Sequence, residues 1–211
     1  MVQSGSRLYL FIGINLIVFI AVGLIRVIEF LFTKGTPVSD WINIQLAMPA
    51  YLPNLLYKPW TPITYMFTHS LSDIFHILFN MLWLYWMGRI FEEFLNSRQF
   101  TFTYLAGGLA GALLYIISYN LFPVFEDYVQ YAMILGASAS VSAVVIATAT
   151  LVPDYSISLL FFGSVRLKYI ALAYILLDLL TIAGPNAGGS IAHLGGALLG
   201  FVFIKQLRSG R

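Results

Sequence analysis

The residues of this chain best suited to chemistry are a serine, two histidines and an asparagine set in apolar sequence: Ser138, His193, His76 and Asn80. A serine hydroxyl is a weak nucleophile unless a nearby base accepts its proton, and histidine is the usual base. Acyl transfer also needs hydrogen-bond donors aimed at the developing oxyanion. His76 and Asn80 are four residues apart, so on a helix they share one face. These types and spacings indicate hydrolysis by a serine nucleophile, with His193 as its base.

The composition indicates that the elements carrying these residues lie in a lipid bilayer. Of the 211 residues, 60% are hydrophobic and only 9% are charged, whereas a typical soluble domain has about 25% charged residues. This excludes a soluble cytosolic enzyme and a disordered regulator. A net charge of +2 does not supply the basic face of a nucleic-acid-binding protein. The chain has no cysteine, which excludes disulfides, thiolate metal sites and a cysteine nucleophile.

Six apolar segments predict an all-α membrane protein, a six-helix bundle forming one domain over residues 1–211. A loop rich in proline and aromatic residues, over residues 33–72, is expected to fold at the membrane interface. Lysine and arginine concentrate on one side of this topology, so both termini are expected in the cytoplasm. The expected spans cover residues 8–32, 73–91, 100–122, 131–152, 167–183 and 190–204. The inner cations are Arg7, Arg89, Arg98, Arg166, Lys168, Lys205, Arg208 and Arg211, and the outer ones are Lys34 and Lys58.

Helix geometry places the four polar groups at similar depths. At 1.5 Å per residue, Ser138 lies roughly 24 Å from the cytoplasmic edge, His193 roughly 18 Å and His76 roughly 20 Å, with Asn80 about 6 Å deeper. Spans two, four and six run in the same direction, so these groups share one layer of a hydrocarbon core about 30 Å thick. If the fourth helix begins at Ser138, it covers only roughly 21 Å. Its first backbone N–H groups would then be free donors beside a wet cavity.

Each polar group also has a purely structural interpretation. Serine and asparagine in membrane helices usually hydrogen-bond their own backbone or a neighbouring helix, and a buried histidine can bridge two helices. Ser140 and Ser142 are expected to have that role, and His69 is expected at the interface. Asp178, about 15 Å from Lys168 along the fifth span, is expected to face the cavity or to bond a neighbouring helix. A direct catalytic role for Asp178 is the less favoured interpretation.

Three stretches make the chain resemble the rhomboid family of intramembrane serine proteases. Residues 76–81, with the sequence HILFNM, match the family's HxxxN pattern in the second span. Residues 136–138, Gly-Ala-Ser, match its GxS start of the fourth span, and residues 192–200 match its AHxxGxxxG pattern in the sixth. The likeness covers the whole six-span core in the same order, and the joint match is far more specific than any one motif.

The resemblance implies a role for each of these residues. Ser138 would be the nucleophile and His193 the general base of a Ser–His dyad with no third member. His76, Asn80 and the backbone N–H of Ser138 would form the oxyanion hole. Gly196 and Gly200 form a GxxxG pattern that would let span six approach span four closely. Span five would be the gate through which substrate enters sideways. No metal or cofactor is implied, since two histidines without a nearby carboxylate make a poor zinc site.

Three positions depart from the family pattern. Ala139 replaces a glycine, and little loss is expected because alanine is small. Ser142 stands where family members often carry an aromatic residue packed against the base, so the orientation of His193 is expected to differ. Thr61 follows Trp60 where an arginine is common, and it cannot donate the forked hydrogen bonds of a guanidinium.

Two other functional classes compete with a protease. A catalytically inactive, derlin-type rhomboid-like protein that binds membrane clients predicts loss of the serine or the histidine, and both are present. A small transporter or channel predicts inverted repeats or matching broken helices, and neither is found. The favoured function is therefore cleavage of transmembrane segments of other membrane proteins, in a prokaryotic plasma membrane. The natural substrate and the oligomeric state stay open.

Overall fold

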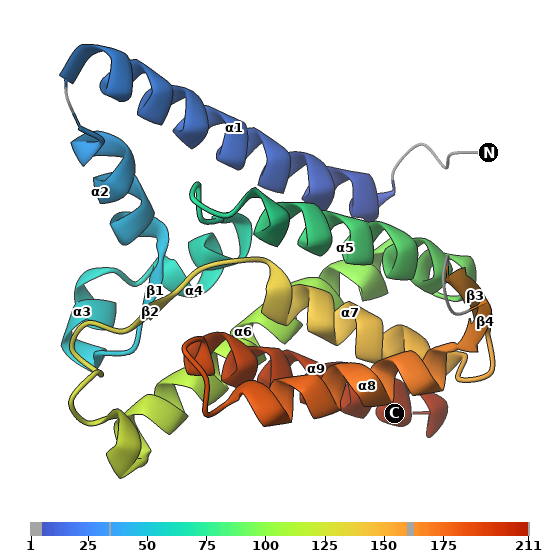
Figure 1. Cartoon of the computed structure of the whole chain (residues 1–211). Coiled ribbons are helices and arrows are strands. Elements are labelled where there is room, and N and C mark those ends of the chain that lie inside the picture. The colour runs from blue at the N-terminus through green and yellow to red at the C-terminus, as the bar shows by residue number, and fades with distance from the viewer. Residues whose placement is uncertain (1–5, 34, 160–162, 211) are drawn as a thin grey trace.

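The fold is a bundle of long helices with a folded segment at one end (Figure 1). The computed structural model describes residues 6–33, 35–159 and 163–210. Lys34 and Arg211, which enter the charge comparison above, lie outside the described residues. The long helices are α1 (Arg7–Thr33), α5 (Ile74–Phe94), α6 (Ser97–Leu121), α7 (Ser138–Leu151), α8 (Leu167–Thr181) and α9 (Ala187–Arg208).

Four helices within the described ranges are long and apolar enough to cross a membrane: α1, α5, α6 and α9. A helix rises 1.5 Å per residue, so the 14 residues of α7 extend only about 21 Å. Residues 139–149 of α7 are all buried, and α7 packs against α5, α6, α8 and α9. A helix that is apolar on every side is normally buried. Helix α7 is therefore the central element of the bundle, and the other helices shield it from the surroundings.

The segment between α1 and α5 folds into short elements that lie over one end of the bundle. They are α2 (Pro37–Leu46), β1 (Met48–Pro49), α3 (Leu52–Tyr57), α4 (Thr61–Thr64) and the 3-10 turn η1 (Tyr65–Phe67). Glu29 on α1 accepts hydrogen bonds from the backbone N–H groups of Val38 and Ser39, which fixes the start of α2. The Tyr65 hydroxyl donates to the Gly108 carbonyl on α6 and so attaches this segment to the core.

The segment expected as the fourth span, residues 131–152, is helical only from Ser138. Residues 131–137 instead form an extended approach, of which β2 (Met133–Ile134) pairs antiparallel with β1. In this register Met48 lies opposite Ile134, and Pro49 opposite Met133. This pairing uses backbone groups that a longer helix would have needed, so the chain enters α7 directly at Gly136-Ala137-Ser138. A further 3-10 turn, η2 (Pro123–Phe125), precedes this approach.

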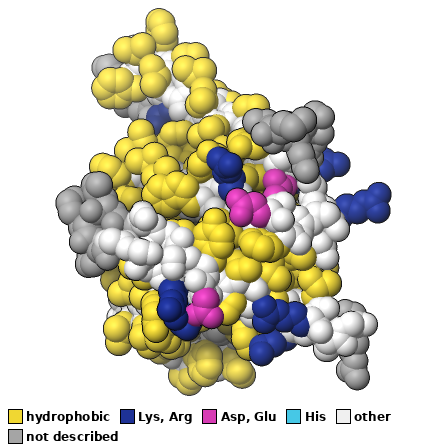
Figure 2. Space-filling model, turned by 90° about the vertical axis from the view of Figure 1, so that its right-hand side faces the viewer, with side chains coloured by type: hydrophobic (Ala, Val, Ile, Leu, Met, Phe, Trp, Pro, Cys, Tyr) yellow, Lys and Arg dark blue, Asp and Glu magenta, His cyan; other side chains and the backbone are white. Residues whose placement is uncertain are grey.

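Charged side chains gather at the opposite end of the bundle, where α1 begins and α9 ends (Figures 1 and 2). A hairpin that the sequence did not suggest, β3 (Ser156–Leu159) and β4 (Gly163–Arg166), lies there and joins α7 to α8. Lys168 and Arg166 bind Asp154 at 2.7 and 3.3 Å. The hydrogen bond and the charge of Lys168 hold the pKa of Asp154 below its usual range. This polar end contrasts with the apolar flanks of the helices.

Candidate active site

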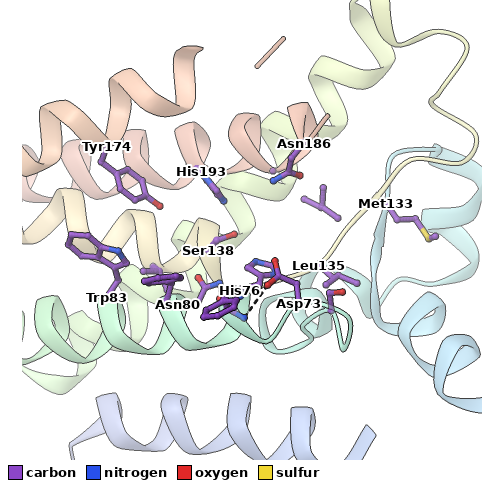
Figure 3. A pocket seen from close by; sticks show the side chains of 16 residues that line it. Asp73, His76, Asn80, Trp83, Met133, Leu135, Ser138, Tyr174, Asn186 and His193 are labelled. Atoms are coloured by element: carbon purple, nitrogen blue, oxygen red, sulfur yellow. Dashed lines mark hydrogen bonds between the residues drawn. The ribbon is translucent and has the colours of Figure 1, made fainter. Parts of the chain in front are cut away.

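A cavity of about 660 Å³ opens at the start of α7, and the four polar groups singled out above all line it. Ser138 comes from α7, His193 from α9, and His76 and Asn80 from α5. Figure 3 shows Ser138 between His193 on one side and the α5 pair on the other. Three helices that are distant in the sequence thus bring these side chains to one place.

The backbone before Ser138 is held in a conformation that requires glycine. Gly136 has φ +131°, a region that other residues rarely adopt. A Cβ at this position would lie 2.8–2.9 Å from the imidazole atoms of His76. The Gly136 N–H donates to the Tyr65 carbonyl at 2.9 Å. Ser138 is therefore presented on the first turn of α7, whose leading N–H groups have no partner within the helix.

His69 supports the same turn from the segment between α1 and α5. It is only 2% exposed, and its Nε2 accepts a 3.4 Å hydrogen bond from the Ala137 N–H. Its ring meets the His76 ring edge-on, with centroids 5.2 Å apart. Burial, and to a lesser extent His76, lowers the pKa of His69 to about 3, so the ring is neutral and can accept this bond. No spacing within the sequence relates His69 to Ala137, because the contact is entirely tertiary.

His76 and Asn80 of α5 line the cavity, and one N–H of the Asn80 amide already donates a hydrogen bond. Asn80 Nδ2 donates to the His76 carbonyl at 2.8 Å, which is the local bond usual for asparagine in a helix. The amide carries a second N–H, because an asparagine side chain has two. Asp73 caps α5 by accepting from the backbone N–H groups of Phe75 and His76. The cap fixes the first turn of α5 and hence the position of the His76 ring.

His193 contacts a carboxylate on the neighbouring helix α8. Its Nδ1 lies 2.8 Å from Asp178 Oδ1 on α8, and Asp178 is 9% exposed. Depth arithmetic contained the signal: Asp178 is about 15 Å and His193 roughly 18 Å from the cytoplasmic edge. Helices α8 and α9 are sequential neighbours in contact. Similar depth on adjacent antiparallel helices permits this pair, but it does not specify which face of α8 meets α9.

An aromatic side chain lies near His193 although Ser142 replaces the one that the family often carries. Tyr174, on α8, has its ring centroid 6.3 Å from that of His193. Its hydroxyl lies 2.8 Å from Ser142 Oγ, and Ser142 also donates to the Ser138 carbonyl at 2.7 Å. The aromatic group is supplied by a different helix, and the small Ser142 leaves room for it. Ser142 and Tyr174 lie on different helices, so the sequence motif around Ser138 does not reveal that Tyr174 supplies the aromatic ring.

Small residues allow α9 and α6 to lie directly against α7. A Cβ at Gly196 would collide with the Ala139 carbonyl, and one at Gly200 with the Ala143 carbonyl. A Cβ at Gly111 of α6 would come within 2.6 Å of the Ala139 methyl group. The alanine that replaces the family's glycine is thus accommodated by a glycine on the facing helix. This close contact sets the distance between His193 and Ser138.

Of the remaining candidates, Thr61 and Trp60 have hydrogen-bond partners. Thr61 is fully buried and donates to the Lys58 carbonyl at 2.8 Å, while Trp60 Nε1 donates to the Gln45 carbonyl at 2.8 Å. The hydrogen bond expected of Ser140 is not formed: its hydroxyl is buried against Gly108 and has no hydrogen-bond partner in the part of the chain that the structure describes, because the close approach of α6 leaves no acceptor there. Within the described ranges no hydrogen bond joins Ser138 Oγ to His193, although both line the cavity. Catalytic hydrogen bonds are often loose before substrate binds.

Comparisons with known proteins identify the family of this chain. A family model described as Rhomboid domain matches residues 57–209. RHOMBOID-like protein 12, mitochondrial, of Arabidopsis thaliana is 32% identical over 161 residues, which are 72% of this chain and 47% of that relative. The chain thus spans about half the length of the relative. The family model covers the segments that carry His76, Ser138 and His193. With its long apolar helices, the chain belongs to the rhomboid family of multi-pass integral membrane proteins.

Proposed function

We propose that this protein is an intramembrane serine endopeptidase that cleaves transmembrane segments of other membrane proteins. The observation that carries the proposal is the convergence of Ser138, His193, His76 and Asn80 on one cavity at the start of α7. Polar groups are costly inside a membrane and are functional candidates by default. A cavity that water can enter supplies the second reactant of a hydrolysis.

In the proposed reaction, Ser138 Oγ attacks the scissile carbonyl carbon while His193 Nε2 takes the hydroxyl proton. The carbonyl oxygen becomes an oxyanion, which the His76 ring, the free Asn80 N–H and the Ser138 backbone N–H stabilise. His193 then protonates the leaving amine as the C–N bond breaks. Water, deprotonated by the same histidine, attacks the acyl-enzyme ester and releases the new carboxyl terminus.

The proposal includes a topology of six spans with both termini in the cytoplasm. The cations at the starts of α1, α6 and α8 and at the ends of α5 and α9 support it, since positive residues favour the cytoplasmic side. The cavity would then face the outer half of the membrane. A substrate helix must unwind there, so glycine or proline near the cut should favour cleavage. We propose the prokaryotic plasma membrane as the location, although the name of the plant relative assigns that protein to mitochondria.

A cleavage assay tests the proposal. The purified protein, reconstituted in liposomes, is incubated with a model transmembrane substrate, and the products are followed on a gel. Wild type and Ser140→Ala should give product, because Ser140 faces Gly108 and not the cavity. Ser138→Ala and His193→Ala should give none, and His76→Ala or Asn80→Ala should lower kcat about 10²–10³-fold. Failure of the wild type, or cleavage by Ser138→Ala, would favour an inactive derlin-type binding protein instead.

A further inference from the structure

We infer that Asp178 is the third member of a Ser138–His193–Asp178 triad. Its carboxylate orients the His193 ring and stabilises the positive charge that the ring gains during catalysis. This inference rests on the proposed function and deepens it, because the resemblance implies only a dyad. The geometry that carries it is the 2.8 Å contact between Asp178 Oδ1 and His193 Nδ1. The opposite ring nitrogen, Nε2, is the one that a serine at the cavity would need.

The contact selects the productive form of the imidazole ring. A carboxylate can only accept a hydrogen bond, so His193 must carry its proton on Nδ1. Nε2 is then unprotonated, with a lone pair available for the Ser138 proton. When that proton arrives, the ring becomes a cation beside the Asp178 anion, and their attraction stabilises the transition state. Asp178 takes no proton in this sequence.

A packing role alone does not account for a carboxylate at this position. Helix α8 is already joined to its neighbours by two uncharged pairs. Thr181 Oγ1 lies 2.9 Å from Ser190 Oγ on α9, and Tyr174 Oη lies 2.8 Å from Ser142 Oγ on α7. A buried charge within a membrane costs far more than such hydroxyl pairs. In the part of the chain that the structure describes, Asp178 Oδ2 is buried with no hydrogen-bond partner, which adds to that cost.

The same geometry links catalysis to the position of α8. Asp178 and Tyr174 both lie near His193 and both belong to α8, which carries neither Ser138 nor His193. Outward movement of α8 would remove both groups from His193 together. The complete triad therefore exists only while α8 is packed against α9.

Matched substitutions on α8 test the triad. Asp178→Asn keeps the shape and removes the charge, and Asp178→Glu restores the charge. Thr181→Val removes the neighbouring α8–α9 hydrogen bond without touching His193. We expect Asp178→Asn to lower kcat about 10²–10⁴-fold with KM unchanged within about twofold. Asp178→Glu should recover part of kcat, and Thr181→Val should cleave like the wild type. A kcat for Asp178→Asn close to that of wild type, or an equal fall in Thr181→Val, would overturn the triad while the proposed protease stands. An inactive wild type would refute the protease, and the triad with it.

A spectroscopic measurement on the wild type does not depend on any Asp178 variant folding. The chain has only three histidines, so ¹⁵N-histidine NMR is simple, and His193→Gln assigns the His193 signals. The triad predicts a proton on Nδ1 and none on Nε2 in the resting protein. A proton on Nε2 instead would contradict it.

Discussion

Replacing His69 by glutamine should make the stability of this protein much less sensitive to acid. His69 is neutral in the folded protein because burial lowers its pKa to about 3, and it accepts a hydrogen bond from the Ala137 N–H. The ring facing it is His76 on α5. Glutamine can accept the same bond through its side-chain oxygen but does not titrate, so His69→Gln isolates the effect of protonation.

The size and direction of the effect follow from the two pKa values. In the unfolded chain the His69 pKa returns to about 6.5. Between pH 6.5 and pH 3 the unfolded chain therefore binds a proton that the folded protein does not. The free energy of unfolding is unaffected above pH 6.5 and falls by about 1.4 kcal/mol per pH unit below it. At pH 5 the loss is about 2 kcal/mol, which corresponds to a Tm lower by about 4–8 °C for a chain of this size.

Thermal unfolding in one detergent at pH 7.5 and at pH 5 measures this difference. Wild type should lose about 4–8 °C more than His69→Gln on acidification. The titration of groups that do not contact His69 cancels in the comparison. Equal losses in the two proteins would mean that His69 is solvated or already charged, and that it does not support the turn before Ser138.

Three further predictions concern packing and access. Gly196→Ala should destabilise the protein by about 1–3 kcal/mol and lower kcat, because its methyl group meets the Ala139 carbonyl; Gly13→Ala, which has open space around it, is the control in a parallel melt and cleavage assay. Gly136→Ala should cost about 1–3 kcal/mol of backbone strain and should displace His76, so a variant with full activity would contradict the assigned oxyanion hole. A cysteine pair replacing Thr181 and Ser190, whose hydroxyls are 2.9 Å apart, should fix α8 to α9 when oxidised. The chain has no other cysteine, so oxidation should form only this disulfide. It should slow the cleavage of transmembrane substrates but leave fluorophosphonate labelling intact, and a reductant should restore cleavage. Unchanged cleavage after oxidation would exclude α8 as the gate.

The sequence predicted the layer of polar groups because depth in a membrane is a one-dimensional quantity. Counting residues from the charged ends was enough to bring Ser138, His193 and His76 to a common level. The start of α7 could also be anticipated from Gly136, which needs a left-handed conformation. Scarcity of polar residues made each of these positions informative.

The features that the sequence could not predict depend on which segments lie side by side in the fold. The partner of Asp178 is decided by which face of α8 meets α9, and depth alone does not specify that face. Pairing of residues 133–134 with residues 48–49, some 85 residues earlier, removes the first turns of the expected fourth helix. His69 is buried because a folded segment covers the bundle end, although its local sequence resembles an exposed loop. In each case a contact between distant segments decided the outcome.

The most direct test of the central claim is covalent labelling of the nucleophile. Wild-type protein in liposomes is treated with a fluorophosphonate, and the intact protein and its peptides are weighed by mass spectrometry. The account predicts one adduct, located on Ser138, which is absent from Ser138→Ala and forms far more slowly in His193→Ala. An unlabelled wild type, or an adduct on another serine, would contradict the claim that Ser138 is an activated nucleophile.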